Sequence, residues 1–513
     1  MSALVQTLAA ASDVAAAVAD IPDVVIDREK AREQEMIRHL PSLAPVLCLV
    51  AATVGGIALS ISVRRQVIVA WAVGLLHVGC AVAALAVWQL RGFDTVMSGT
   101  VAVDGLSLAL AGIVGVGGTL SVMLMRGTLA RTDREGELYA MLAAASLGSL
   151  LLGSARDVAL LALALGLTGI ASYVMAGYLR RSPASNEASL KFYIYGTVAG
   201  AVMIYGLTLW YGLAGSTDIA VIGTALPSAP TAAVVGATAL IVVGLAFEAS
   251  LVPFHFWTPD VYEGAPISVA AFVSVIPKAA ALVALARILP LALPDGLVGW
   301  PTAIAAISAV TMVLGTLAAM TQRNVVRLLA WSSIAQAGFM LMGVAALESS
   351  AEGLPALVYY LIAYAATNLA AFTVAACVAR DRGSVDIDAF AGLARRHPLQ
   401  GAALLVALLS LLGVPPLSGF VGKLEVFTAA IDAGQAWLAV VGIVATVAWL
   451  YPYLRVLAPA FLDAPGDEPR QGALASRPAL VVTLGLAGLA TVGVGIGAQP
   501  FLELAEHAVA LGA

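Results

Sequence analysis

The stretch from Leu240 to Arg287 decides the fold, and it reads LIVVGLAFEASLVPFHFWTPDVYEGAPISVAAFVSVIPKAAALVALAR. It predicts an apolar helix that carries Glu248, breaks at Pro253 and is followed by a loop over residues 257–266. A second apolar helix then carries Lys278 deep inside it. A charge near the middle of a bilayer costs about 2.5–3.5 kcal/mol on insertion scales, so such residues usually have a function. A broken helix at membrane depth is tolerated only where it faces protein or a wet cavity. Together these features indicate a path for a proton or another small cation.

The rest of the chain is as apolar as this stretch. Of its 513 residues, 61% are hydrophobic and only 11% are charged, which is too little charge for the surface of a soluble protein. Long continuous apolar runs exclude a transmembrane β-barrel, whose strands alternate in character. A span needs about 20 apolar residues. The sequence therefore predicts an all-α polytopic membrane protein with about 14 transmembrane helices, near residues 41–62, 66–90, 103–126, 138–154, 157–179, 188–212, 232–255, 266–289, 300–320, 325–346, 355–379, 400–428, 434–460 and 478–498.

The remaining features of the sequence offer few other functions. Cys48, Cys80 and Cys377 all lie in apolar spans and have no metal-site spacing, so we expect buried free thiols and no metal. No basic stripe supports binding to nucleic acid. The polar lead-in over residues 1–40 lacks the basic start of a signal peptide. Its charged run, Asp23–Arg38, is expected to be a surface helix or a flexible segment.

Positive residues are distributed unevenly between the loops. Loops rich in Arg and Lys face the cytoplasm, and here the loops after odd-numbered spans carry almost all of them. These loops hold Arg64, Arg65, Arg126, Arg131, Arg134, Arg180, Arg181, Lys191, Arg323, Arg327, Arg380, Arg382, Arg395, Arg396, Arg470 and Arg477. We therefore expect a multi-pass protein of the cell membrane with both termini on the outer face.

Two of the four lysines lie in the most apolar surroundings. Lys30 is in the lead-in, and Lys191 is near a helix start, from which its ammonium can reach the cytoplasmic face. Lys278 and Lys423 are too deep in their spans for that. A desolvated lysine changes its protonation state readily, so these two are candidate proton carriers. The alternative is a lysine held in a permanent ion pair.

Two spans are broken beside these deep charges. Pro253 interrupts the seventh span after Glu248, and a Gly- and Pro-rich segment over residues 413–419 interrupts the twelfth before Lys423. The breaks are five spans apart, so the two helices enter the membrane from opposite sides, as in inverted repeats with discontinuous helices. The alternative is a pair of ordinary proline kinks. We predict the lead-in 1–40, spans 1–3 over 41–137, a first repeat of spans 4–8 over 138–290, a second repeat of spans 9–13 over 300–460, and the last span with a tail over 461–513.

Other polar residues accompany the first break. His255 follows Glu248 by seven residues, on the same helix face if the break is modest, and an ordinary pKa of about 6.5 suits a proton relay. The alternative is a hydrogen-bonded structural histidine. Asp260 and Glu263 lie in the predicted loop without a basic residue nearby in sequence, either as a site of proton uptake or in a solvated turn. Later spans add polar side chains that either extend a hydrated line or serve packing: Tyr359, Tyr360, Tyr364, Asn368, Tyr451 and Arg455.

Several motifs resemble those of one known family. The segments GLAFEASLVPFHFWTPDVYEGAP (244–266), SVIPK (274–278), RNVVRLLAWSSIAQAGF (323–339) and LLSLLGVPPLSGFVGK (408–423) are similar to the antiporter-like membrane subunits of respiratory complex I. The ending VYEGAP resembles subunit N of the bacterial proton-pumping NADH:quinone oxidoreductase, whereas subunits L and M and the multisubunit cation/proton antiporters differ there. Residues 137–157 and 185–196 also fit, so the resemblance covers roughly residues 103–460.

The resemblance implies a fourteen-helix fold with two inverted five-helix repeats. It also implies a membrane-arm subunit that moves protons while NADH oxidation and quinone reduction elsewhere drive the complex. NADH, FMN, iron–sulfur clusters and quinone would be bound by other subunits and no cofactor by this chain, in which no nucleotide motif is visible. Its partners would be lipid and other membrane subunits, both antiporter-like and small helical ones. Lys278 matches the lysine of the family's eighth helix, and Lys423 matches that of the twelfth.

Three positions depart from the family's pattern. Gly166 stands where the family has a glutamate in the fifth helix, Glu248 where it has a lysine, and Gln336 where it has a histidine. In the family, the first two residues form an ion pair whose opening and closing gates the channel. Here the acid of that pair is absent and the base is replaced by an acid. Glu248 therefore either pairs with Lys278 or titrates alone.

These observations favour proton transfer past Glu248, Lys278 and His255 and then across the midplane to Lys423, with no redox site in this chain. Protons would be taken up near residues 260–266. Two alternatives stay open. The altered pair would make the chain a structural subunit that transmits coupling but pumps little, or the chain would be a cation/proton antiporter. The antiporter would be active as an isolated chain, whereas the other two functions need a large complex.

Overall fold

The computed structural model describes residues 39–90, 94–129, 134–294, 297–464 and 478–510, and it is dominated by helices. Within these ranges, 13 helices are long and apolar enough to cross a membrane. The twelfth predicted span adds one more, because it is divided into two shorter helices, α17 (Pro398–Leu412) and α18 (Ser418–Asp432). The prediction of an all-α polytopic membrane protein is confirmed. The predicted lead-in lies almost entirely outside the described residues.

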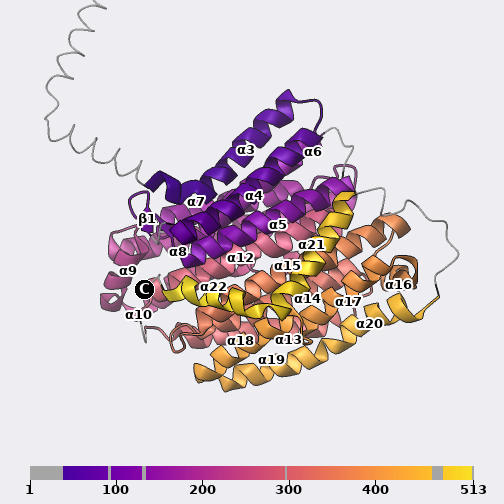
Figure 1. Cartoon of the computed structure of the whole chain (residues 1–513). Helices are drawn as coiled ribbons and strands as arrows, with labels where there is room; N and C mark the ends of the chain where they lie inside the picture. The colour runs from indigo at the N-terminus through magenta and orange to yellow at the C-terminus, as the bar shows by residue number, and fades with distance from the viewer. Residues whose placement is uncertain (1–38, 91–93, 130–133, 295–296, 465–477, 511–513) are drawn as a thin grey trace, which may run out of the picture.

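The first spans form a group on one side of the molecule, drawn in indigo in Figure 1. A short 3-10 helix, η1 (Leu40–Leu43), precedes them, and an antiparallel hairpin connects the second and third. The members are α3 (Ala44–Ser62), α4 (Val67–Leu90), β1 (Asp94–Val96), β2 (Val101–Val103), α5 (Gly105–Leu129) and α6 (Glu135–Ser154).

The next group contains the first break. Its members are α7 (Val158–Ala176), α8 (Pro183–Ala214), α9 (Ile219–Ala225), η2 (Leu226–Ser228), α10 (Thr231–Glu248), α11 (Trp257–Gly264) and α12 (Ile267–Ala292). The loop predicted over residues 257–266 is wrong, because most of it is the helix α11, and the interruption lies earlier, at residues 249–256. The reason is local. Pro259 lies in the first turn of α11, where its missing N–H breaks no helical hydrogen bond.

The last group contains the second break. Its members are α13 (Trp300–Ala319), α14 (Val325–Ala345), α15 (Gly353–Arg382), η3 (Ile387–Phe390), α16 (Leu393–Arg396), α17, α18, α19 (Ala436–Ala448), α20 (Leu450–Leu462), α21 (Pro478–Ile496) and α22 (Ala498–Ala510). Helices α19 and α20 together make one span, Ala436–Leu462.

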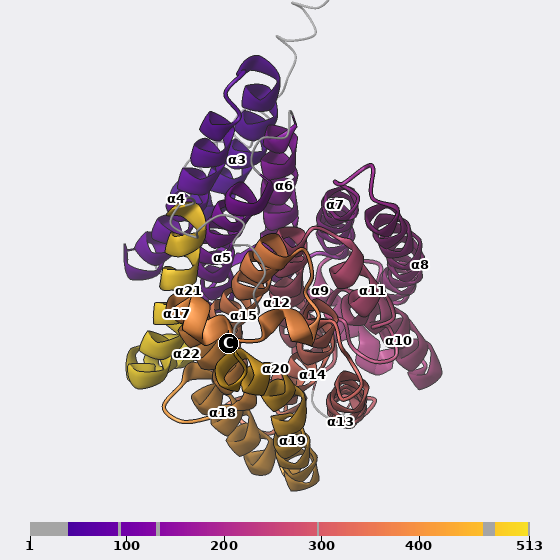
Figure 2. The same ribbon diagram turned by 90° about the vertical axis from the view of Figure 1, so that its right-hand side faces the viewer.

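Three helices form the interior. Helices α12, α14 and α15 are almost entirely buried, whereas α3 and α8 expose most of their length. Figure 2 shows α12 and α15 near the centre, between the group of α7, α8, α10 and α11 and the group of α18, α19 and α20. The outer faces are apolar too, with Trp71, Leu163 and Val447 largely exposed, as a surface in contact with lipid requires. Polar residues of the three interior helices are therefore enclosed by protein.

The loops rich in arginine meet at one end of the molecule. Arg380, at the end of α15, donates a hydrogen bond to the carbonyl of Gly127, at the end of α5. The loop before α14 pairs with the loop after α15 through Asn324 and Asp386. At the opposite end, the loops around Asp157 and Asp218 form a similar bridge. Loops that follow odd-numbered and even-numbered predicted spans therefore lie at opposite ends of the molecule, as the predicted spans require.

Candidate functional site

Lys278 lies at the centre of the most buried helix. It is 1% exposed, and it directly follows Pro277 inside α12. Its Nζ donates hydrogen bonds to the backbone oxygen of Ser333 at 2.9 Å and to the Oγ of Ser333 at 2.7 Å, both on α14. No carboxylate of the described residues forms a salt bridge with it. Lys278 is thus held by neutral oxygen atoms rather than by the permanent ion pair of the alternative interpretation.

A line of hydroxyl groups leads away from Lys278. The Oγ of Ser333 lies 2.8 Å from the hydroxyl of Tyr364 on α15, and that hydroxyl donates to the backbone oxygen of Ser274 at 3.0 Å. Because this donation uses the only phenolic proton, Ser333 donates to Tyr364 and accepts from Lys278. Asn368 donates to the Oγ of Ser274 at 2.6 Å. Donors and acceptors are therefore ordered in one direction, from the ammonium through two hydroxyls to a carbonyl.

Lys423 is held by the second break. It is 3% exposed, and its Nζ donates to the carbonyl of Leu412 at 3.0 Å and to the Oγ1 of Thr446 at 3.2 Å. The same Nζ lies 4.4 Å from the centre of the Phe339 ring. Leu412 ends α17, where carbonyls lack helical partners and carry the negative end of the helix dipole. Gly413 follows with a φ of 93°, and a Cβ there would come within 3.0 Å of the lysine side chain. The break therefore creates both the acceptor and the space for Lys423.

Gln336 lies between the two lysine sites. Its Oε1 accepts a hydrogen bond from the hydroxyl of Tyr360 at 2.5 Å, and its Nε2 donates to the carbonyl of Leu411 at 2.9 Å. Leu411 directly precedes Leu412, so adjacent carbonyls of one helix end hold Gln336 and Lys423. A glutamine amide has no titratable proton. Gln336 thus connects Tyr360 to the end of α17 by hydrogen bonds without carrying a proton itself.

A narrow void separates the Lys278 line from Gln336. Its walls include the polar side chains of Gln336, Tyr360, Tyr364, Thr367 and Ser410. It has no room for a water-sized sphere in this conformation, although its polar walls would suit water if it widened. The two lysines are therefore not joined by a continuous line of hydrogen bonds between the described residues.

Glu248 is buried at the first break without a partner. It ends α10 and is 2% exposed, and neither of its carboxylate oxygens has a hydrogen-bond partner among the described residues. It makes no salt bridge with Lys278 in this part of the chain. Gly166, in contrast to the buried Glu248, lies on the exposed face of α7, where an added Cβ would meet open space. Glu248 is therefore inside the fold, whereas Gly166, the position predicted to match the family's acid, is on its surface.

His255 lies within the first break itself. It is 5% exposed, and its ring centre is 4.8 Å from that of Phe256 and 5.5 Å from that of Trp331. Its Nδ1 has no hydrogen-bond partner among the described residues. The structure places it among aromatic rings, with no hydrogen bond to Glu248 or Lys278 in the described ranges. Its part in a relay stays a prediction.

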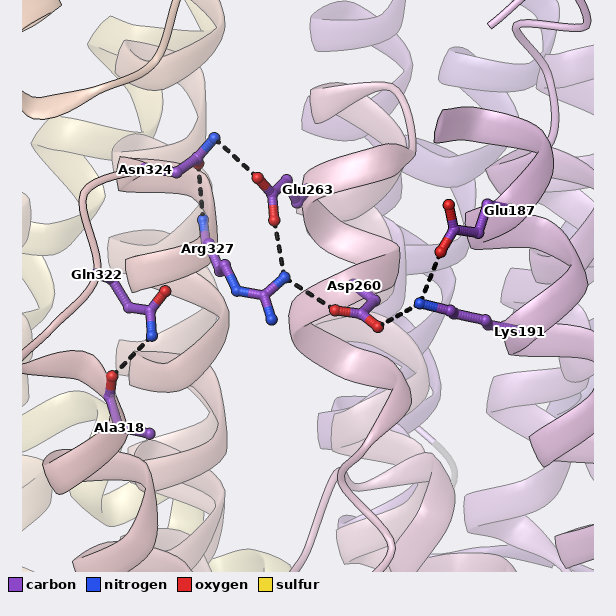
Figure 3. A network of polar contacts seen from close by, with 8 residues as sticks. All are labelled: Glu187, Lys191, Asp260, Glu263, Ala318, Gln322, Asn324 and Arg327. Atoms are coloured by element: carbon purple, nitrogen blue, oxygen red, sulfur yellow. Dashed lines mark hydrogen bonds and ion pairs between the residues drawn. The ribbon is translucent and has the colours of Figure 1, made fainter. Parts of the chain in front are cut away.

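A network of ion pairs connects three helices at the arginine-rich end (Figure 3). Asp260 on α11 binds Lys191 on α8 at 2.7 Å and Arg327 on α14 at 2.8 Å. Arg327 also binds Glu263 at 2.7 Å, and Lys191 binds Glu187 at 2.8 Å. Asp260 and Glu263 are therefore paired with basic residues that are distant in sequence, on α8 and α14.

These ion pairs also set the charge of Asp260. Burial would raise the pKa of its carboxyl, but hydrogen bonds from Lys191 and Arg327, together with their charges, outweigh burial and lower that pKa below its ordinary value. The side chains of all three residues are about one third exposed, so solvent screens the pairs and each stabilises the fold only slightly. Asp260 is thus ionised at neutral pH and suited to hold α11 against its neighbours rather than to take up protons.

Sequence reasoning missed a buried ion pair at the opposite end. Arg287 on α12 binds both carboxylate oxygens of Asp104, at 2.5 and 2.8 Å, and donates from Nε to the carbonyl of Gly153 at 2.9 Å. Asp104 also caps α5, because its carboxylate accepts from the backbone N–H of Ser107 at 2.9 Å. The polar residue directly before an apolar helix was a usable capping signal, but nothing in the sequence pairs it with Arg287. The pair fixes the helix of Lys278 to α5 and α6.

Comparison with known proteins agrees with this architecture. Residues 155–448 match the family described as NADH:quinone oxidoreductase/Mrp antiporter, TM. A relative named NADH-quinone oxidoreductase subunit N 1, from Streptomyces griseus, is 38% identical over 89% of this chain and 95% of its own. NADH-quinone oxidoreductase subunit N from a Mycobacterium species is 38% identical over 92% of this chain and 99% of its own.

Solved structures with the same fold include a chain of respiratory complex I from Thermus thermophilus with bound aureothin. It is 33% identical, has a TM-score of 0.76, and is matched over 90% of this chain and 99% of its own. A chain of the Mrp complex from a Dietzia species has a TM-score of 0.81 at 23% identity, covering 92% of this chain and 97% of its own, and this likeness concerns the fold alone. By sequence and by fold, this chain belongs to the subunit N family of the NADH-quinone oxidoreductases, within the antiporter-like transmembrane proteins.

Proposed function

We propose that this chain is a proton-translocating subunit in the membrane arm of an NADH:quinone oxidoreductase. Its partners are other membrane subunits of that complex, both antiporter-like and small helical ones, and the surrounding lipid. NADH, FMN, iron–sulfur clusters and quinone belong to other subunits, so the chain has no redox site of its own. It lies in the cell membrane with its arginine-rich end in the cytoplasm and both termini outside.

One observation supports this function above the others: two lysines are buried at the centre of the fold and are held only by neutral oxygen atoms among the described residues. A lysine paired with a carboxylate would leave an unpaired buried charge whenever it lost its proton, which costs several kcal/mol (about 3–5). A lysine held by hydroxyls and carbonyls leaves no such charge. Lys278 and Lys423 are therefore suited to alternate between protonation states.

The proposed route follows the polar line. Protons enter near residues 260–266 without titration of Asp260, pass Glu248 and His255, and reach Lys278. They continue through Ser333 and Tyr364 and cross the void beside Gln336 to Lys423. Because the void has no room for water in this conformation, transfer between the lysines requires a second conformation in which it widens. Moving one charge across the membrane costs about 2.3 kcal/mol per 100 mV, which distant redox chemistry supplies.

The two broken spans also support the division proposed from the sequence. Spans 4–8 over residues 138–290 and spans 9–13 over residues 300–460 form the two repeats, with breaks at residues 249–256 and 413–417. Lys423 lies against the end of α17, where carbonyls are free, whereas Lys278 lies in the middle of α12. The two repeats thus supply one lysine each to the proposed route.

Purification of the tagged full chain from its native membrane tests the function. We expect the other subunits, FMN and NADH:quinone oxidoreductase activity to co-purify, and the complex in sealed vesicles to acidify one side when NADH is added. The isolated chain in the same vesicles should move no cations. Exchange of sodium or potassium for protons by the isolated chain would contradict the proposal and favour the antiporter.

A non-pumping structural subunit is the second candidate. It is favoured by Glu248, which has no partner among the described residues, and by Gly166, which removes the family's acid from the surface of α7. Glu248→Gln distinguishes the two, because it keeps the size of the side chain and removes its titration. A relay through Glu248 predicts fewer protons moved per NADH. An unchanged ratio, with normal assembly, would favour the structural role.

A further inference from the structure

A cavity of about 850 Å³ lies at the arginine-rich end, between the start of α6 and the turn that connects α7 with α8. Three exposed arginines contribute to its walls: Arg134, Arg180 and Arg181. The rest of the wall is largely apolar and is formed by Leu138, Met141, Val174, Met175 and Leu179. The cavity therefore combines a basic rim with an apolar interior.

The arginines of this rim differ from the four basic residues that bind carboxylates elsewhere in the described residues. Arg126, Lys191, Arg287 and Arg327 all bind carboxylates within the chain. No carboxylate of the described ranges forms a salt bridge with Arg134, Arg180 or Arg181. Glu137 is the one acidic residue among those that line the cavity, which leaves an excess of two positive charges there.

We propose that this cavity binds the headgroup of an anionic phospholipid, whose acyl chains run along α7. A guanidinium group binds a phosphate through two parallel hydrogen bonds. Basic pockets between transmembrane helices on the cytoplasmic side are suited to anionic headgroups. Below the cavity, one face of α7 exposes Leu163, Ile170 and Val174. These residues are seven and four positions apart and share a helix face, so they provide an apolar track for an acyl chain.

The apolar wall argues against a small soluble anion as the ligand. Phosphate or another hydrated anion would gain nothing from Leu138, Met141 and Met175, and it would lose water on that side. A phospholipid uses both walls, because its charge meets the arginines while its chains meet the apolar side chains and α7. The cavity also lies at the end of a membrane-spanning helix, at the depth where headgroups lie.

Lipid titration of the full chain, purified in detergent, tests the site by native mass spectrometry. The probes are dioleoyl phosphatidylglycerol, dioleoyl phosphatidylcholine, dihexanoyl phosphatidylglycerol and inorganic phosphate. The site variant is R134Q/R180Q/R181Q, and the matched control is R64Q/R65Q/R323Q, which removes three exposed arginines from the same end outside the cavity. All six side chains are exposed, so neither variant should disturb the fold.

We expect the site variant to lower the affinity for long-chain phosphatidylglycerol on the order of 100-fold, and the control to lower it less than threefold, since each basic residue near a headgroup contributes severalfold. Phosphatidylcholine and the short-chain lipid should bind weakly to all three proteins. Equal losses in the two variants, or no loss in either, would overturn the proposal. Tight binding of inorganic phosphate, or its competition with the lipid at equal concentration, would identify a small-anion site instead.

Discussion

Replacing Asp104 by asparagine tests how the Lys278 helix is held in place. Asp104 and Arg287 are 14% and 7% exposed, and their two hydrogen bonds of 2.5 and 2.8 Å are almost removed from water. Removing one partner of such a pair leaves a buried charge uncompensated and costs about 3–5 kcal/mol. Asparagine can still cap α5 and accept one hydrogen bond, so we expect Asp104→Asn to cost about 3 kcal/mol, at the lower end of that range.

The assay is reversible unfolding of the purified chain in mixed micelles of increasing SDS content, followed by tryptophan fluorescence. Asp157→Asn is the matched control, because Asp157 caps α7 through Ala159 and Leu160 and has no arginine partner among the described residues. It should change the free energy of unfolding by a few tenths of a kcal/mol, about 0.3. The double variant D104N/R287M should recover most of the loss, since it leaves no buried charge. Asp104→Asn with the stability of the control would refute the reasoning. So would a double variant whose loss equals the sum of the losses of Asp104→Asn and Arg287→Met measured separately.

The same ion pair makes stability depend on pH. Burial would raise the pKa of Asp104, but the charge of Arg287 and hydrogen bonds from Arg287 and Ser107 outweigh burial and lower it. A carboxyl whose folded pKa is below its unfolded value of about 3.9 stabilises the fold at every pH above that value. The contribution is lost as the pH falls through the folded pKa. Asp104→Asn should lack this acid-dependent loss.

Three further variants test other parts of the structure. Tyr364→Phe removes the hydroxyl between Ser333 and Ser274, and it should slow NADH-driven proton pumping in vesicles without affecting assembly; an unchanged rate would exclude this hydroxyl line. Gln336→Leu leaves the hydroxyl of Tyr360 without its acceptor and should lower the free energy of unfolding by about 1–3 kcal/mol, whereas a neutral effect would show that the amide bonds are unimportant. Asp260→Asn should cost less than about 1 kcal/mol, because Asp260 and its partners are about one third exposed, and should leave pumping intact; lost pumping would return Asp260 to the relay.

The number of spans could be predicted from the sequence because lipid demands long apolar runs, whatever the packing inside. Which face of each helix packs against protein could not be predicted, because the inward and outward faces are equally apolar. On α7, for example, Leu163 is exposed and Leu161 is buried. The helix α11 was expected to be a loop, although its Pro259 lies in the first turn, where a proline breaks no helical hydrogen bond. Such local ambiguities are resolved only by tertiary contacts, here the ion pairs of Asp260.

The deep lysines could be predicted because a charge in lipid is rare and costly. Their partners could not. Most Ser and Thr residues in membrane helices donate to a carbonyl one turn earlier, as Thr168 does to Ala164, and Ser333 has no feature in the sequence that distinguishes it from these. The ion pair of Glu248 with Lys278, which the sequence left open, is absent from the described residues. Pairing across helices depends on distances that the sequence does not encode locally.

The central claim is that Lys278 and Lys423 carry the protons, and the number of protons moved per NADH tests it most directly. The measurement compares Lys278→Ala, Lys423→Ala and the matched control Lys30→Ala in sealed vesicles that contain equal amounts of assembled complex. The account predicts a lower ratio for each of the first two variants and an unchanged ratio for the control. A full proton-to-NADH ratio in both deep-lysine variants would contradict it.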